Sequence, residues 1–252
     1  MMSTQIDTGQ MRRVEEALRR IASVREVSGQ FVVNVPVRYP SGGMAVVSID
    51  ENNGKCWVSD LGHGLMEAAF LGAQEYYART ARDVAQAFGV EFDGHSIFAL
   101  QVAMSRLESA IVCIANASNQ AAQDAVRLSS EAHSHRKSEQ IFERISTIFG
   151  PKVVAKSRHV DGRHVAWEAH NVVAMPNGNT AVFEYMTSHA NSVSSRFLMF
   201  SDIRMLDQKI SLNVVVQNAR SLDAKGQMIG DVANIIEFNA ADQEFIQFAS
   251  AA

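Results

Sequence analysis

Apolar and polar positions follow two different periods along the chain, and the changes of period mark the predicted elements. Over 9–22, apolar side chains recur at helical spacing with arginine and glutamate between them, which predicts an amphipathic helix. That stripe consists of Met11, Val14, Leu18 and Ile21. Valine-rich runs then predict an antiparallel meander, because turns containing glycine or asparagine separate them. The predicted strands are Gln30–Arg38, Met44–Ile49 and Lys55–Ser59.

Helical patterns follow over 65–72 and 75–88, where Gly89 ends the second. The strongest pattern covers 97–132, in which neither proline nor glycine occurs. Its apolar stripe comprises Leu100, Ala103, Met104, Leu107, Ala110, Ile111, Ile114 and Ala117. Two uses of this stripe stay open, as core or as the contact of a homodimer. We expect His133-Ser134-His135 to break the helix and a second helix to cover 138–149.

After Pro151 the pattern changes to strands, which predicts two domains, 1–135 and 136–252. The predicted strands are Lys152–Arg158, His164–Met175, Thr180–Thr187 and Ile210–Gln217, with a helix over Ala190–Leu206. Helical segments over 221–233 and 240–248 flank a short strand at 235–238. The fold class is therefore α+β, with a meander, a long central helix and an α-β-β-β-α-β order at the end. That order resembles the minimal core of the restriction endonucleases.

Charge and composition narrow the partner class. The net charge is −4, whereas a protein that binds duplex DNA usually carries a basic surface, so a nucleic-acid partner is disfavoured without being excluded. The two cysteines, Cys56 and Cys113, have neither disulfide-framework nor metal-site spacing. No run of about 18 apolar residues is present, so we expect no membrane span. A reducing cytoplasm is the expected compartment.

Two acidic residues form the candidate site. Nucleases of the resembled fold hold Mg²⁺ with an acid on the second core strand and with a Glu-x-Lys on the third. Here Glu168 lies on the second predicted strand and Glu184 on the third. His170 completes the candidate set of catalytic residues, and the two glutamates would be the metal ligands. No other cofactor is expected.

The turn between these strands sets their register. Pro176-Asn177-Gly178 is typical of a type I turn followed by a glycine bulge, which makes a three-residue loop. Met175 then pairs with Asn179, so that His170 faces Glu184. Because side chains alternate along a strand, we expect Glu168, His170 and Glu184 on one face. A two-residue loop would put the two glutamates on opposite faces.

The lysine of the Glu-x-Lys motif is missing. Met186 occupies its position, and an apolar thioether cannot stabilise the charge that develops on a phosphate. Replacement from another element is open to Lys152, Lys156 and Lys209. The competing interpretation is structural, with Glu168 and Glu184 as partners of His170 or Arg196.

Other polar positions have structural interpretations that we favour. Asp60 and His63 at the end of the meander predict a tight turn with a helix cap rather than a catalytic pair. His133 and His135 lack a third metal ligand, which favours a solvated linker. His159 lies on a different element from His164 and His170, so we expect no zinc site there. Cys56 is expected in the core, and Trp57 and Trp167 are expected to pack inward.

Three segments resemble a pair of uncharacterised prokaryotic domains that occur together in bacterial, prophage and plasmid proteins. They are Cys56–Gly62, Gly162–Glu168 and Phe197–Asp202. The resemblance covers about 25–120 and 140–245, and the sequence departs from it at Leu61, where an acid is commoner, and at Glu168, where aspartate is usual. It implies a setting of mobile elements and phage–host conflict rather than an activity.

Three hypotheses follow. The first is a non-catalytic binding protein of phage or mobile-element origin that inhibits a host defence complex, as anti-CRISPR or anti-restriction proteins do, by occupying a protein or nucleic-acid surface. The second is a Mg²⁺-dependent nuclease that uses Glu168 and Glu184. The third is a toxin-neutralising or regulatory partner without catalysis.

Overall fold

The computed structural model describes residues 11–13, 16–17, 22–27, 29–206 and 209–250. The chain divides into two compact units, Met1–Glu131 and Ala132–Ala252, each with its own sheet. The border falls four residues before the predicted one. Residues 11–13 and 16–17 are helical, and most of the rest of the helix predicted over 9–22 lies outside the described residues.

The sheet of the first unit contains six described strands in the order β1-β2-β3-β4-β6-β5, with antiparallel neighbours throughout. Their bounds are β1 Val24–Val27, β2 Gln30–Arg38, β3 Met44–Asn52, β4 Lys55–Ser59, β5 Glu91–Phe92 and β6 Ile97–Ala103. The predicted meander is thereby confirmed. Its helices are α2 His63–Phe70, α3 Gln74–Phe88 and the N-terminal part of α4 Leu107–Phe149.

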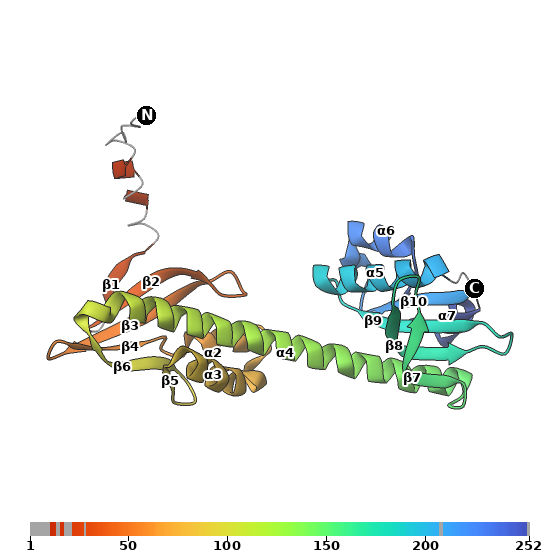
Figure 1. Ribbon diagram of the computed structural model, residues 1–252, viewed down its shortest axis with the longest axis horizontal. Helices are drawn as coiled ribbons and strands as arrows, with labels where there is room; N and C mark the ends of the chain where they lie inside the picture. The colour runs from red at the N-terminus through yellow and green to blue at the C-terminus, as the bar shows by residue number, and fades with distance from the viewer. Residues whose placement is uncertain (1–10, 14–15, 18–21, 28, 207–208, 251–252) are drawn as a thin grey trace. The chain divides into compact units, whose positions relative to one another are not determined.

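One face of this sheet carries the core of the unit. All three helices lie along the sheet (Figure 1), and side chains of β2, β3, β4 and β6 pack there against them. The sheet contributes buried valines such as Val47 and Val58, and α4 contributes a row of buried alanines with Ile114. Small side chains let the helix lie close to the strands. Trp57, predicted to pack inward, is 44% exposed and touches Phe98 edge to face, with 6.0 Å between the ring centroids.

The helix predicted over 97–132 begins as a strand. Ile97–Ala103 is β6, a short 3-10 turn covers Met104–Arg106, and α4 starts only at Leu107. Leu100 and Met104, placed on the predicted apolar stripe, are 56% and 54% exposed. Periodicity cannot separate a short buried strand from a helix in an apolar run of this length. Pairing with β4 decides the outcome in favour of the strand.

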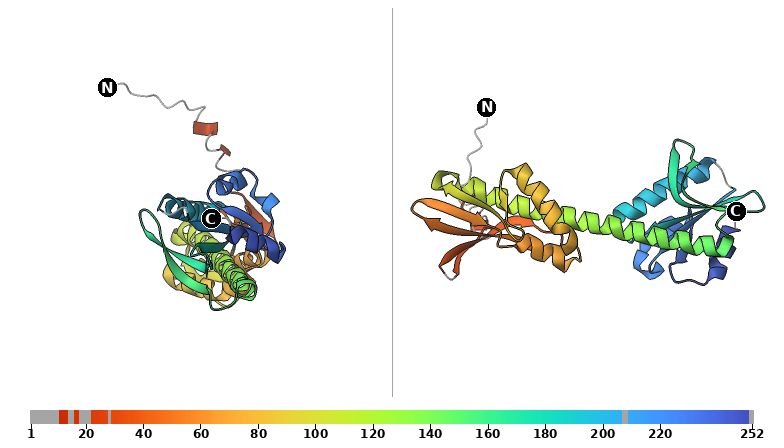
Figure 2. Two further views of the ribbon diagram at one scale, coloured as in Figure 1. Left: turned by 90° about the vertical axis from the view of Figure 1, so that its right-hand side faces the viewer. Right: turned by 90° about the horizontal axis from the view of Figure 1, so that it is seen from below.

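The expected break at His133-Ser134-His135 does not occur. Helix α4 continues through it to Phe149, over 43 residues (Figures 1 and 2). The prediction was wrong because serine and histidine are only mildly unfavourable in a helix, whereas the residues that end one, glycine and proline, come first at Gly150 and Pro151.

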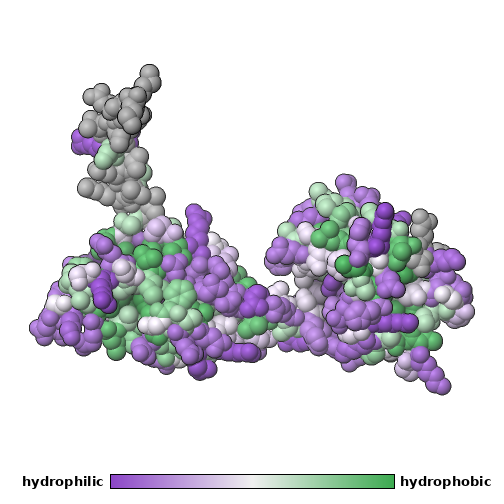
Figure 3. Space-filling model, viewed as in Figure 1, coloured by the Kyte–Doolittle hydropathy of each residue, from purple (hydrophilic) through white to green (hydrophobic). Residues whose placement is uncertain are grey.

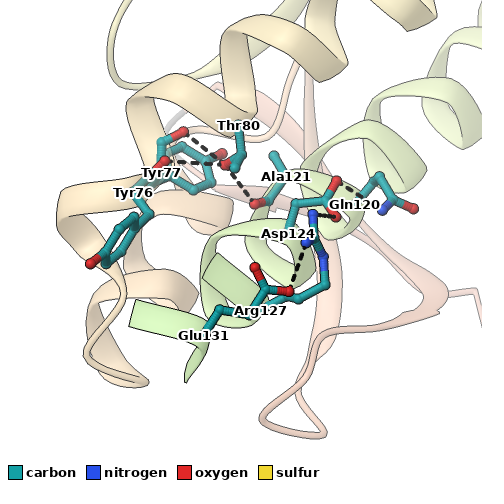
Figure 4. A network of polar contacts seen from close by, with 8 residues as sticks. All are labelled: Tyr76, Tyr77, Thr80, Gln120, Ala121, Asp124, Arg127 and Glu131. Carbon is teal, nitrogen blue, oxygen red and sulfur yellow. Dashed lines mark hydrogen bonds and ion pairs between the residues drawn. The ribbon is translucent and has the colours of Figure 1, made fainter. Parts of the chain in front are cut away.

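Helix α4 is held to α3 by a buried hydroxyl. The Thr80 Oγ1 lies 2.9 Å from the carbonyl oxygen of Ala121 and 3.1 Å from that of Tyr77 (Figure 4). On the solvent side of α4, Arg127 donates to Glu131 at 3.0 Å and to Asp124 at 3.4 Å. Such exposed pairs one turn apart stabilise a helix by about 0.3–0.5 kcal/mol each. These surface pairs therefore add little to the stability of α4.

The second unit has a mixed five-stranded sheet among the described residues, in the order β11-β10-β9-β8-β7. Its strands are β7 Val154–Asp161, β8 Ala166–Ala174, β9 Thr180–Met186, β10 Ile210–Val216 and β11 Asn234–Glu237. Strands β7, β8 and β9 are antiparallel, while β9, β10 and β11 are parallel. The remaining elements are α5 Ala190–Leu206, the 3-10 turn Ala219–Leu222, α6 Ala224–Gly230 and α7 Asp242–Ala249.

Helices cover both faces of this sheet. One face packs against α5 and α6, and the other packs against α7 and the C-terminal turns of α4 (Figure 1). From the end of α4 onward the elements follow the predicted α-β-β-β-α-β order, and the mixed α+β class with a long central helix is confirmed. Among the described helices, none combines the length and the apolar character that a membrane crossing requires.

Candidate functional site

The hairpin between β8 and β9 has the predicted register. Met175 N donates to Asn179 O at 2.8 Å, and Gly178, at φ 83°, donates to Met175 O at 3.0 Å. The positive φ is why glycine stands at this position. Above the turn, Ala174 pairs with Thr180 and Asn171 with Phe183, so the three-residue loop is confirmed.

Glu184 and His170 meet one step beyond the last of these pairs. The Glu184 carboxylate accepts the backbone N–H of His170 at 2.5 Å and lies 2.9 Å from its ring Nδ1. The Glu184 carboxylate thus accepts the backbone N–H of His170 just beyond the point where the backbone pairing of β8 with β9 ends. The Glu184 carboxylate is completely buried, so these hydrogen bonds replace the water that it has lost.

Arg196 supplies the opposite charge. Its guanidinium lies 3.0 Å from Glu184 Oε2, and its Nε donates to the Tyr185 carbonyl at 3.4 Å. Arg196 comes from α5, which packs on the same face of the sheet. Both Glu184 oxygens are therefore occupied by groups of the protein, as the structural interpretation expected for this residue.

The groups around His170 shift the pKa of its imidazole. The hydrogen bond that His170 donates to Glu184 raises the pKa of the His170 imidazole above its ordinary value, and burial opposes that rise. Nearby Arg196 also opposes it, whereas the charge of Glu168 supports it weakly. A positively charged His170 next to Glu184 strengthens an ion-pair cluster.

Glu168 does not join this cluster. Its neighbours on β8, Trp167 and Ala169, pack in the core on the α5 side, so Glu168 points to the other face and is exposed. The expectation that Glu168 shares a face with His170 and Glu184 was wrong. The strand alternation changes at His170, across from Ser157, which has a left-handed φ of 52°. The β8–β9 turn, from which the register was predicted, contains no residue that would indicate this irregularity in β7.

Met186 stands where a nuclease motif would have its lysine. Met186 is 1% exposed and belongs to the apolar core. Lys156 is paired with Glu139 on α4 and lies 5.6 Å from the ring centroid of Phe142, on the sheet face opposite Glu184. The role that the motif assigns to lysine is therefore not filled by Lys156.

The residues present do not fit Mg²⁺. A hard cation requires several oxygen ligands converging on one point. Glu184 is committed to Arg196 and His170, and Glu168 points away from it. In the part of the chain that the structure describes, no group of three histidine, cysteine, aspartate or glutamate side chains could hold a metal ion. No catalytic step through a metal can be derived from this arrangement.

A second polar centre lies around Asp202 on α5 and was not among the predicted site residues. Its carboxylate accepts Trp167 Nε1 at 2.8 Å and the backbone N–H of His164 at 3.1 Å, and it lies 2.5 Å from the His164 ring Nδ1. The Trp167 hydrogen bond, reinforced by His164, lowers the pKa of Asp202 to about 2. A Cβ at Gly162 would lie 2.2 Å from an Asp202 oxygen. Glycine is therefore required at this position.

This centre joins two of the segments that carry the prokaryotic-domain resemblance. Gly162–Glu168 supplies the loop, and Phe197–Asp202 supplies the acid that holds it. The signal for Asp202 was thus present in the sequence, but the 38-residue separation from His164 hid the contact. Trp167 is half-buried against α5, in line with the inward packing expected of it.

Asp60 plays a similar role in the first unit. It is fully buried and accepts the backbone N–H groups of Gly62 at 3.0 Å and of Ile97 at 2.9 Å. The Ser118 hydroxyl donates to it at 2.6 Å and also lies 2.7 Å from the Tyr39 hydroxyl. His63 N donates to the Asp60 carbonyl at 3.0 Å, which confirms the tight turn. The N-cap residue of α2 is Gly62, without a side-chain cap, while Gly64 N donates to the Asp60 carboxylate at 3.2 Å. Because every lone pair has a donor, Asp60 has the environment of a structural residue.

The other candidate residues are dispersed. His135 lies 3.6 Å from Glu139 along α4, and His133 lies beside the Tyr185 ring. His159 pairs across the strands with Glu168, away from His164 and its partner Asp202. Cys56 is buried in the core as predicted. The histidines are thus not gathered into a metal site.

Comparisons of the chain with protein-family models, with curated proteins and with solved structures give no match.

Proposed function

We propose that this chain is a non-catalytic binding protein that acts by occupying the surface of another protein. The observation that carries the proposal is the state of Glu184. It is fully buried, paired with Arg196 and hydrogen-bonded to His170. A nuclease carboxylate has to bind the metal ion that polarises the phosphate, whereas the oxygens of this one are already paired with groups of the protein.

The biological setting comes from the resemblance. The α-β-β-β-α-β order and the segments around Asp60, Trp167 and Asp202 support a relation to paired prophage and plasmid domains. A degenerate nuclease-like core kept as a scaffold fits a mobile element in conflict with its host. The protein acts in the cytoplasm and inhibits a host defence complex of the CRISPR or restriction kind.

A protein partner is favoured over a nucleic acid. The formal charge is −4 over 252 residues, so no global field attracts a phosphate backbone. Apolar side chains are instead exposed on the first unit, among them Leu100, Met104 and Val112, each more than half accessible. Exposed apolar groups of this kind are typical of protein-binding surfaces when they gather in one region.

A cleavage assay separates this function from the alternative, a Mg²⁺-dependent nuclease. Supercoiled plasmid, single-stranded DNA and RNA are incubated with the protein and Mg²⁺ or Mn²⁺. The expected result is no metal-dependent cleavage. Cleavage that disappears in both Glu168→Ala and Glu184→Gln, and persists in the exposed control Glu244→Gln, would overturn the proposal. Glu168 is exposed, so its variant stays folded and keeps the test decisive.

The anti-defence role has its own measurement. The protein is expressed in bacteria that carry an active CRISPR or restriction system, and a targeted phage is plated on them. We expect the efficiency of plating to rise against at least one system. Unchanged plating against every system would remove the anti-defence role.

A further inference from the structure

Strand β6 has an open edge. It pairs with β4 from Phe98 to Ala103, but on its other side β5 covers only Ile97 and Phe98. Among the described residues, no strand pairs with Ala99–Ala103 on that side. Backbone N–H and C=O groups along such an edge are a template for another strand. The edge is also distorted, since a register shift and a left-handed Gln101 at φ 58° interrupt it.

A groove with both apolar and polar residues in its lining runs beside this edge. It has a volume of about 600 Å³ and lies between β6, the end of α3 and the first turns of α4. Its lining includes Phe88, Val90, Val102, Ala110 and Cys113. A shallower hollow continues it along α4 past Val112. Figure 3 shows apolar side chains gathered over the N-terminal half of α4 and the neighbouring strands.

Apolar side chains of the groove and of the hollow are accessible to solvent. Phe88 is 40% exposed and Val112 is 52% exposed, although both are apolar and sit on helices whose opposite faces are core. Arg106 stands at the end of the edge, where β6 passes into α4, and lines the groove. Among the described residues, no acidic side chain forms an ion pair with it. Glu108 lines the shallower hollow, on the Val112 side.

We propose that this edge and groove bind an extended segment of another protein, which adds a strand beside Ala99–Ala103. Its backbone pairs with β6, an apolar side chain enters the groove between Phe88 and Cys113, and a carboxylate reaches Arg106. The inference rests on the proposed function and names the surface that performs it. Strand addition of this type takes affinity from main-chain hydrogen bonds and specificity from side-chain pockets.

Three features favour this occupant over others. A free edge is satisfied by a strand, whereas a docked helix offers no main-chain partners to it. Arg106 without an acidic partner selects a carboxylate over a lysine. A second copy that paired its own β6 about a two-fold axis would bring no carboxylate on that strand to Arg106, because Ile97–Ala103 contains no acidic residue.

A designed peptide tests the proposal with the full chain. The probe is a fluorescein-labelled peptide of alternating valine and threonine with glutamate at both ends, and its binding is followed by fluorescence anisotropy. One control peptide carries N-methyl groups on alternate backbone amides, and another carries lysine in place of glutamate. We expect the first probe to bind, while the N-methylated peptide binds at least about tenfold more weakly because its main-chain donors are removed.

Protein variants locate the binding. Val112→Glu and Arg106→Glu are expected to weaken the acidic probe about tenfold or more, and Arg106→Glu is expected to bind the lysine peptide better than the wild type does. Phe70→Glu is the matched control, since Phe70 is 80% exposed and lies on α2, outside the groove lining. It should leave the affinity within about twofold.

Several outcomes would overturn the proposal. They are equal binding of the N-methylated peptide, unchanged affinity in Val112→Glu, and no binding by the wild type. Sedimentation velocity adds another: a dimer that Val112→Glu dissociates and Phe70→Glu does not would assign the groove to a second copy. None of these results bears on nuclease activity. The peptide-binding experiments therefore test the groove proposal, and the cleavage assay separately tests the non-catalytic function.

Discussion

Replacing Arg196 with methionine removes the positive charge that neutralises Glu184 and keeps much of the aliphatic stem. In the wild-type protein the guanidinium lies 3.0 Å from Glu184 Oε2, and the Glu184 side chain has no exposure to solvent. The Arg196 side chain retains 21%. The variant leaves a buried carboxylate with the half-exposed His170 as its remaining partner. The structural role of the cluster predicts a large loss of stability.

The size of that loss can be bounded. At 3.0 Å and an effective dielectric constant of about 20, the attraction of two unit charges is roughly 5–6 kcal/mol. Removing one partner of a buried pair typically costs about 3–5 kcal/mol. Because His170 still donates two hydrogen bonds to the carboxylate, we expect the lower end, about 3 kcal/mol. That is a large share of the roughly 5–15 kcal/mol that stabilises a typical domain.

Urea unfolding followed by tryptophan fluorescence measures this loss of stability in the second unit of the chain. The chain has two tryptophans, and Trp57→Phe leaves Trp167 as the reporter of the second unit. Arg158→Met on β7 is the control, since Arg158 is exposed. The double variant Glu184→Gln/Arg196→Met should recover part of the loss, because it leaves no unpaired charge in the core.

A loss below about 1 kcal/mol in Arg196→Met, equal to that of the control, would refute the reasoning, since it is the value of an exposed salt bridge. It would mean that Glu184 tolerates the absence of its partner. A free carboxylate at this position would then be available for other ligands.

Three further outcomes are expected. Because folding raises the pKa of His170, this residue contributes stability that is complete below its ordinary pKa of 6.5 and is lost as pH rises through the higher pKa of the folded state. The free energy of unfolding of the second unit should therefore fall above pH 6.5. His170→Gln should lack that fall. Asp202 has a pKa of about 2 in the folded protein against an ordinary value of 3.8, so it contributes stability above pH 3.8 that is lost as pH falls through about 2. Asp202→Asn should flatten this acid transition and speed amide hydrogen exchange at His164 and Val165. Unchanged exchange at these amides would argue that Asp202 does not hold the loop. Asp60→Ala leaves three buried backbone N–H groups without their acceptor and should cost the first unit about 3 kcal/mol or more. Hydrogen-exchange mass spectrometry should show faster exchange there and unchanged exchange in the second unit.

Local chemistry made parts of the site predictable. The β8–β9 register follows from Pro176-Asn177-Gly178 alone, because turn residues specify loop length over a few positions. The pairing of His170 with Glu184 follows from that register, and Arg196 was already one of the expected partners. The meander and the α-β-β-β-α-β order are set by strand periods that tertiary contacts do not override.

Other parts depend on contacts that the sequence does not display. Ile97–Ala103 has an apolar pattern compatible with helix and strand, and only its neighbour β4 selects the strand. Glu168 is turned away from Glu184 by an irregularity opposite Ser157, on a different strand. Asp202 holds a loop that precedes it by 38 residues. In each case the deciding partner is distant along the chain.

Manganese binding tests most directly whether Glu184 is a structural residue or a metal ligand. Mn²⁺ is titrated into the full chain, and the electron paramagnetic resonance signal of the free ion is recorded for the wild type, Glu168→Ala and Glu184→Gln. With Glu184 held by Arg196 and His170, and Glu168 on the opposite face, we predict no stoichiometric uptake and three superimposable titrations. Stoichiometric uptake by the wild type that is lost in both variants would contradict this and restore the nuclease.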